Sequence, residues 1–194
     1  PGGRHRALVV LDLDGTILDL YHHKEISPVV KAAIDKVQAA GIPVTIGTGR
    51  TLDYVRAHTG PLGITTPVVT TQGAVIGDPV TGKVLHETDM PLSAAREVAA
   101  WIDETQPISV FYFSDEHGHT QIIQNRTGPD PDFYDHVFGV PRTVAPSFSE
   151  LLAGVDAPSP IKFISINDPE RQADIAPGLK ERFAGQLSIT RTHP

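Results

Sequence analysis

The sequence predicts an α/β fold, on the basis of three observations. Apolar strand-like segments alternate with amphipathic helical segments over residues 1–74, an order typical of a parallel sheet covered by helices. After Gly73 the order changes and includes a hairpin, which indicates a mixed α+β region of comparable size. The chain has 194 residues, 40% of them hydrophobic and 20% charged, as in a globular protein with a sizeable core. We therefore place the first domain at residues 1–74 and the second at residues 75–194.

The elements of the first domain follow from local patterns. Residues 7–13 are apolar and rich in β-branched side chains, as in a strand buried on both faces. Residues 27–41 carry helix signals at both ends, because Ser27 can cap the N-terminus and Gly41 suits the position after the C-terminus. The remaining elements are two strands at 42–48 and 66–71 and a short helix at 51–59.

The second domain is predicted to contain strands, two longer helices and a loop-rich middle. A helix over 91–106 would be capped by Ser93, and a hairpin would carry a polar tip in which we interpret His117 and His119 as turn residues. The aromatic residues Trp101 and Phe111–Phe113 are expected in its core. The other expected elements are strands at 83–89, 108–114, 120–125, 160–167 and 186–192, and a helix at 168–185 bent at Pro177.

The composition of the chain excludes several classes of protein. A net charge of −7 argues against a surface for nucleic acid or anionic membranes. The chain has no cysteine, which excludes disulfides, thiolate metal sites and cysteine nucleophiles. No apolar run approaches the roughly 20 residues of a membrane span. We therefore expect a cytoplasmic protein that binds neither nucleic acid nor membrane.

Two carboxylates close the first predicted strand. Asp12 and Asp14 are two residues apart, so in an extended chain their side chains point roughly the same way. Ligands collect at the carboxyl ends of the strands in parallel α/β sheets. Gly15 permits a sharp turn that brings backbone amides close to an anion, and Thr16 adds a hydroxyl. Such a pair suits two tasks, holding a hard cation such as Mg²⁺ or serving as nucleophile and general acid or base.

Three segments together resemble a known family. "LDLDGTILD" at 11–19 resembles the first motif, D-x-D-G-T, of the haloacid dehalogenase superfamily, whose members are mostly phosphatases. "VTIGTGR" at 44–50 is similar to the second motif, and its T-G-R ending resembles the Cof-like branch. "VVTTQGAVI" at 68–76 resembles that branch's passage from the third strand to the cap, with Gln72 where Asn is usual. The resemblance covers nearly the whole chain and implies the N-terminal part of a Rossmannoid core with a large inserted α/β cap.

The resemblance implies a Mg²⁺-dependent phosphatase, a hydrolase of a small phosphorylated metabolite such as a sugar phosphate. Asp12 would take the phosphoryl group as an aspartyl-phosphate, and Asp14 would protonate the leaving group and then help to activate water. Mg²⁺ would be held by the Asp12 carboxylate and the Asp14 backbone carbonyl. Thr48 would hydrogen-bond the phosphoryl group, with the Gly15 and Gly49 amides nearby. These roles suit phosphoryl transfer, which depends mainly on positioning and on neutralising charge.

Several assignments stay open at this point. A sugar phosphomutase or a sugar-conjugate phosphatase would use the same chemistry. Arg50 would either clamp a substrate anion or pair with a core carboxylate. His22 and His23 would overhang the active site or lie in solvent, and Lys162 would point to the cleft or form a structural pair. The role of Gln72 is also open.

Two motifs of the superfamily do not appear in the sequence. These are a lysine that screens the phosphoryl charge and a G-D-x-x-N-D-like acidic run, and both follow the cap in the Cof-like pattern. The first strand is expected to lie inside a sheet, with a neighbouring strand on each side. At the edge of a sheet it would expose an apolar edge, which natural proteins avoid. We weigh three explanations: a truncated chain, a second chain that completes the core, and a remnant that binds a ligand or partner without turnover. The first is the interpretation that we favour.

Overall fold

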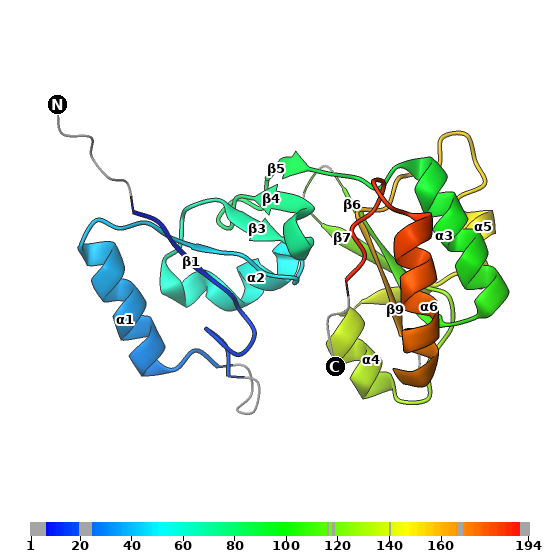
Figure 1. The fold of residues 1–194 in the computed structure, drawn as a ribbon. Helices are drawn as coiled ribbons and strands as arrows, with labels where there is room; N and C mark the ends of the chain where they lie inside the picture. The colour runs from blue at the N-terminus through cyan, green and yellow to red at the C-terminus, as the bar shows by residue number, and fades with distance from the viewer. Residues whose placement is uncertain are drawn as a thin grey trace. The chain divides into compact units, whose positions relative to one another are not determined.

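The computed structural model describes residues 7–19, 25–115, 117, 119–139, 141–166 and 169–190 (Figure 1). Its contacts divide the chain into two compact units. The first consists of Pro1–Thr88 with Asp115–Thr120, and the second of Asp89–Ser114 with Gln121–Pro194. None of the helices in the described part of the chain combines the length and hydrophobicity that a membrane span needs.

The first unit is an α/β structure built on a parallel pair of strands. β1 and β2 run parallel, with Val9 opposite Val44 and Leu11 opposite Ile46. A parallel bridge between Gly47 and Val69 connects β2 to β3, and β3, β4 and β5 then follow as an antiparallel sheet. The elements are β1 (Val9–Leu11), α1 (Pro28–Ala39), β2 (Val44–Ile46), α2 (Leu52–Thr59), β3 (Val68–Thr70), β4 (Val75–Gly77) and β5 (Val84–Glu87), with short 3-10 turns at Gly60–Leu62 and Thr71–Gly73.

Helix α1 begins and ends as predicted. The Ser27 hydroxyl accepts a hydrogen bond from the Val30 amide at 3.2 Å, which satisfies one of the unpaired donors of the first turn. Gly41, just after the helix, has a φ of 74°, a conformation that glycine adopts at little cost. The buried Ile34 belongs to the same apolar core as Val44 and Ile46 of β2. These contacts support the prediction of a helix-covered parallel sheet.

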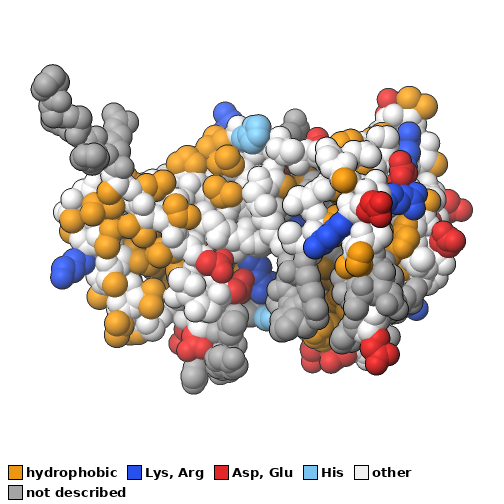
Figure 2. Space-filling model, viewed as in Figure 1, with side chains coloured by type: hydrophobic (Ala, Val, Ile, Leu, Met, Phe, Trp, Pro, Cys, Tyr) orange, Lys and Arg blue, Asp and Glu red, His pale blue; other side chains and the backbone are white. Residues whose placement is uncertain are grey.

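One side of β1 is exposed in the described part of the chain. Within that part, β2 is the strand that pairs with β1. Leu8 and Val10 are 56% and 57% exposed, and Val29 at the start of α1 is 79% exposed. Figure 2 shows hydrophobic side chains gathered on this part of the first unit. An apolar edge strand is a ready template for pairing with a further strand.

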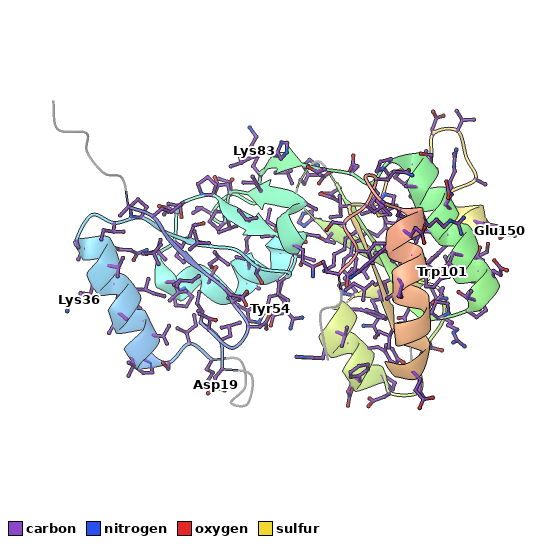
Figure 3. The ribbon with its side chains drawn as sticks, viewed as in Figure 1. Asp19, Lys36, Tyr54, Lys83, Trp101 and Glu150 are labelled. Atoms are coloured by element: carbon purple, nitrogen blue, oxygen red, sulfur yellow. The ribbon has the colours of Figure 1, made fainter. Side chains whose placement is uncertain are left out.

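The second unit is a four-stranded sheet with helices. The strand order is β8-β7-β6-β9, with β6 and β9 antiparallel and β7 and β8 parallel. Trp101 on α3, seen in Figure 3, lies in one buried cluster with Phe111 and Phe113, as predicted. The elements are α3 (Leu92–Thr105), β6 (Ile108–Ser114), β7 (Thr120–Gln124), α4 (Pro131–Phe138), β8 (Arg142–Val144), α5 (Phe148–Leu151), β9 (Lys162–Ile166) and α6 (Pro169–Arg182).

Two expectations for the second unit are wrong. Ser93 does not cap α3, because the helix already begins at Leu92, with Pro91 in the capping position and no side-chain cap. Leu92 packs against the apolar core, and this contact draws the helix start forward. Residues 186–190 form no strand, although Leu187 and Ile189 pack against the same core, so their apolar pattern reflects packing rather than pairing. The rest of that predicted strand lies outside the described residues.

Asp115, His117, His119 and Thr120 from the tip of the predicted hairpin belong to the first unit. The Asp115 carboxylate accepts hydrogen bonds from the His117 and His119 amides, each at 2.9 Å. The Thr120 amide donates to an Asp53 carboxylate oxygen at 2.9 Å. The contacts also group residues 75–88 with the first unit. The domain boundary at residue 74, which the sequence led us to expect, remains a prediction.

Asp103 connects two helices of the second unit and generates a prediction on stability. Its carboxylate accepts hydrogen bonds from the Ser147 hydroxyl at 2.9 Å and from the Phe148 and Ser149 amides at 3.0 and 2.8 Å. Desolvation by itself would raise the pKa of Asp103, but the hydrogen bonds from Phe148, Ser149 and Ser147 outweigh it and lower the pKa. The charged carboxylate therefore stabilises the start of α5.

We predict that Asp103→Ala lowers the free energy of unfolding by about 1–2 kcal/mol at pH 7, because the hydrogen bonds that its carboxylate accepts from the start of α5 are lost. The folded-state pKa is depressed, so the stabilisation is present above the ordinary aspartate pKa of about 4 and fades as the pH falls through the folded value. Urea unfolding between pH 7 and pH 2 measures this difference. The matched control is Glu104→Ala, at an exposed neighbour on the same helix, with little expected effect. A difference for Asp103→Ala that does not shrink in acid would contradict the assignment.

Candidate active site

Three parallel strands end at one edge of the first unit. The Gly47 amide donates to the Leu11 carbonyl at 2.9 Å, which joins the ends of β1 and β2. The Thr48 amide donates to the Val69 carbonyl at 3.0 Å, which joins the ends of β2 and β3. The segments that begin at Asp12, Thr48 and Thr71 therefore leave the sheet side by side. Such an edge is the usual ligand site of a parallel α/β sheet.

The loop after β1 is anchored by buried apolar side chains. Leu13, Ile17 and Leu18 are at most 2% exposed, and the Leu13 carbonyl accepts from the Ile17 and Leu18 amides at 3.0 and 2.9 Å. Gly15 has a φ of 74°, and its amide donates to the Leu18 carbonyl at 2.9 Å. The Gly15 amide is thus engaged within the loop, and its predicted contact with a phosphoryl group stays a prediction. Burying the apolar residues leaves Asp12 exposed and Asp14 partly exposed.

Asp12 and Asp14 have different surroundings. The exposed Asp12 carboxylate accepts a hydrogen bond from the Leu13 amide at 2.7 Å. Asp14 instead accepts two hydrogen bonds from Arg50, Nε to Oδ2 at 2.7 Å and Nη2 to Oδ1 at 3.1 Å. The Asp14 and Arg50 side chains are 24% and 18% exposed. This fork-shaped contact restrains both groups, so one carboxylate faces solvent while the other is held by a cation.

Arg50 is in turn positioned by α2. Its guanidinium carbon lies 4.8 Å from the ring centroid of Tyr54, which projects from α2 (Figure 3). The Tyr54 ring stacks on His58, with 4.1 Å between centroids. The sequence left two partners open for Arg50, and the structure shows the pairing with a carboxylate. The sequence did not reveal the role of Tyr54, although it follows Arg50 by four positions and lies in the first turn of a predicted helix.

Thr48 and Gly49 form the second side of the site. Thr48 is 7% exposed, and its hydroxyl oxygen accepts from the Arg50 amide at 3.2 Å. The hydroxyl hydrogen is then oriented away from that amide and suits an anionic acceptor. Gly49 has little room for a side chain, because a Cβ there would lie 3.2 Å from Gln72 Cγ. Gln72 therefore packs on this loop, a contact that the sequence did not reveal.

The remaining candidate residues belong to the second unit or are not described. Lys162 belongs to the second unit, where its ammonium nitrogen lies 5.1 Å from the ring centroid of Tyr112. His22 and His23 lie outside the described residues. In the described part of the chain, no group of three or more His, Cys, Asp or Glu side chains is arranged to hold a metal.

The donor set nevertheless suits a magnesium ion shared with a ligand. Arg50 engages the Asp14 carboxylate, whereas the Asp12 carboxylate is exposed. Mg²⁺ typically binds one or two carboxylates and completes its coordination with water and phosphate oxygens. The Asp12 carboxylate together with a backbone carbonyl fits that requirement.

Comparisons with known proteins agree with this geometry. A family model described as haloacid dehalogenase-like hydrolase matches residues 9–194. The phosphatase YwpJ of Bacillus subtilis is 35% identical over 96 residues, which is 50% of this chain and 33% of YwpJ. The crystal structure of TM0651 from Thermotoga maritima superposes with a TM-score of 0.72 at 22% identity, over 97% of this chain and 66% of TM0651. The sugar phosphatase BT4131 gives 0.65 at 18% identity, over 89% and 63%.

The Asp14–Arg50 contact leads to a prediction on coupling. In a double-mutant cycle of Asp14→Ala and Arg50→Ala, we expect a coupling free energy of about 1–2 kcal/mol in unfolding, because two partly buried hydrogen bonds are lost together. The control cycle uses Lys31 and Asp35 on α1, which make a single contact at 2.6 Å and are 43% and 51% exposed. That pair should couple by only about 0.3–0.5 kcal/mol. Equal coupling in the two cycles would be inconsistent with the contact described here.

Proposed function

The chain belongs to the haloacid dehalogenase-like hydrolases, in the Cof-like branch, and from this membership we propose that the protein is a Mg²⁺-dependent phosphatase. It spans about two thirds of TM0651 and one third of YwpJ, so the activity of the whole protein is part of the proposal. The observation that supports it most is the edge where an exposed Asp12 lies beside an arginine-held Asp14 and the Thr48 hydroxyl.

Asp12 is the proposed nucleophile. Its exposed carboxylate, oriented by the Leu13 amide, attacks the phosphorus of a phosphate monoester. A bond forms between the Asp12 oxygen and phosphorus while the bond from phosphorus to the leaving oxygen breaks, which gives an aspartyl-phosphate. Water then attacks the same phosphorus, releases inorganic phosphate and restores the carboxylate.

Asp14 is the proposed proton carrier, and Arg50 orients its carboxylate. The leaving oxygen needs a proton, which Asp14 provides, and the attacking water later returns one to Asp14. Both Asp14 oxygens accept N–H groups of Arg50, so the guanidinium holds the carboxylate in one orientation at this edge of the sheet.

Mg²⁺ is the proposed cofactor, held by the Asp12 carboxylate and the Asp14 backbone carbonyl. When bound, the ion neutralises charge on the phosphoryl oxygens and allows a carboxylate to approach a dianion. Thr48 would donate its hydroxyl hydrogen to the phosphoryl group, and the Gly49 amide lies in the same loop. These contacts position the group for transfer.

A small phosphorylated metabolite such as a sugar phosphate is the proposed substrate. The fold is similar to that of the sugar phosphatase BT4131, which motivates this choice. A phosphomutase or a sugar-conjugate phosphatase would use the same residues. We also propose that the second unit serves as the cap that selects the substrate, since loops over a site commonly set specificity. The proposed location is the cytoplasm.

We propose that a further strand covers the exposed side of β1, because Leu8 and Val10 there are more than half exposed. It would come from the same polypeptide or from a second chain. The resemblance implies that such a segment also carries the lysine and the acidic residues of the superfamily. A protein that binds ligands without turnover is the alternative from another class.

Hydrolysis of p-nitrophenyl phosphate tests the proposed chemistry. Wild-type protein should release phosphate in the presence of Mg²⁺, and hydrolysis should stop when EDTA removes the metal. Asp12→Asn should lower kcat by at least about a thousandfold, because the nucleophile is lost. The control Asp35→Asn, an exposed aspartate on α1, should keep full activity. Activity that survives Asp12→Asn would refute the assignment of Asp12 as the nucleophile. A folded wild-type protein without turnover would favour the alternative of a protein that only binds ligands.

A further inference from the structure

The turn after β3 has an unfavourable backbone conformation. The φ angles of Thr71, Gln72 and Gly73 are 52°, 57° and 97°, all in the left-handed region. Glycine adopts this region freely, but it is uncommon for glutamine and a clear outlier for a β-branched threonine. Strain of this kind persists where the surrounding structure imposes it, and it is concentrated at functional sites. The turn therefore needs an explanation beyond chain reversal.

Hydrogen bonds to the loop after β2 hold this turn in place. The Thr71 amide donates to the Arg50 carbonyl at 2.8 Å, and the Gln72 amide donates to the Thr48 carbonyl at 3.1 Å. The Thr71 hydroxyl is buried without a hydrogen-bond partner among the described residues, so it does not account for the conformation. The strained turn is thus connected to the loop Thr48–Arg50, in which the Thr48 hydroxyl is proposed to contact the phosphoryl group.

The result of this conformation is the position of the Gln72 side chain. A Cβ on Gly49 would lie 3.2 Å from Gln72 Cγ and 3.6 Å from Nε2, so the side chain lies against Gly49. Gln72 is nevertheless exposed. Its carboxamide can donate two hydrogen bonds and accept two, and it carries no charge. A neutral amide with both functions is suited to hydroxyl groups.

We infer that Gln72 orients the substrate of the proposed phosphatase by hydrogen-bonding a hydroxyl of the leaving group. Neighbouring strands are about 4.8 Å apart, so β3 lies about 10 Å from β1 and its nucleophile. At that distance Gln72 is beyond the reacting phosphorus, where the rest of the substrate extends. The residue would thereby favour hydroxyl-rich phosphate esters over esters with apolar leaving groups. This inference rests on the proposed function.

Gln72→Gly tests the inference, with Gln106→Gly as a matched control. The two glutamines have φ angles of 57° and 56°, and Gln106 lies at the end of α3 in the second unit. Glycine relieves the strained backbone at both positions, so both variants should keep or raise the thermal midpoint. Gln72→Gly should lower kcat/KM about fivefold for glucose 6-phosphate or ribose 5-phosphate, as for one lost hydrogen bond. It should change kcat/KM for p-nitrophenyl phosphate less than about twofold, since that leaving group has no hydroxyl.

Further measurements distinguish a failure of the role of Gln72 from a failure of the proposed phosphatase function. Gln72→Asn, which keeps the amide and tolerates the left-handed region, should recover part of the lost activity, and Gln106→Gly should leave both substrates unaffected. An equal loss on all esters, no loss on the sugar phosphates, or wild-type turnover of p-nitrophenyl phosphate alone would overturn the role of Gln72. Wild-type protein that hydrolyses no ester would overturn the proposed function and this inference with it.

Discussion

Two backbone hydrogen bonds, from Gly47 to Leu11 and from Thr48 to Val69, hold the ends of β1, β2 and β3 together. This constraint matters because residues that are far apart in the sequence meet only where the parallel strands end. Each strand then supplies a different group at the same edge. The first supplies carboxylates, the second a hydroxyl and an arginine, and the third the strained turn with Gln72.

Electrostatics explains how two close carboxylates can coexist at this edge. The chain carries a net charge of −7, so a phosphate dianion needs local positive charge to approach. Arg50 balances Asp14, the ring of Tyr54 supports the guanidinium, and Asp12 remains exposed. The site thus divides into a balanced pair and one accessible carboxylate. We propose that Mg²⁺ supplies the remaining positive charge.

Much of the fold could be predicted because local patterns carried it. The α1 caps and the apolar runs of β1 and β2 depend on neighbouring residues, and so does the placement of Asp12 and Asp14 after a strand. The partner of Arg50 was left open, since it depends on side-chain geometry between distant segments. Only Gly73 marked the turn after β3, whereas the left-handed Thr71 and Gln72 result from hydrogen bonds to another loop. Ser93 was misassigned because packing of Leu92 moved the start of α3.

The central claim is that Asp12 becomes phosphorylated during turnover. The most direct measurement is to mix the protein with p-nitrophenyl phosphate and Mg²⁺, quench it in acid and treat it with borohydride, which reduces an acyl phosphate to an alcohol. Peptide mass spectrometry then identifies the modified residue. The account predicts reduction at Asp12. Reduction at Asp14 or another residue, or unmodified peptide from protein that is hydrolysing the ester, would contradict it.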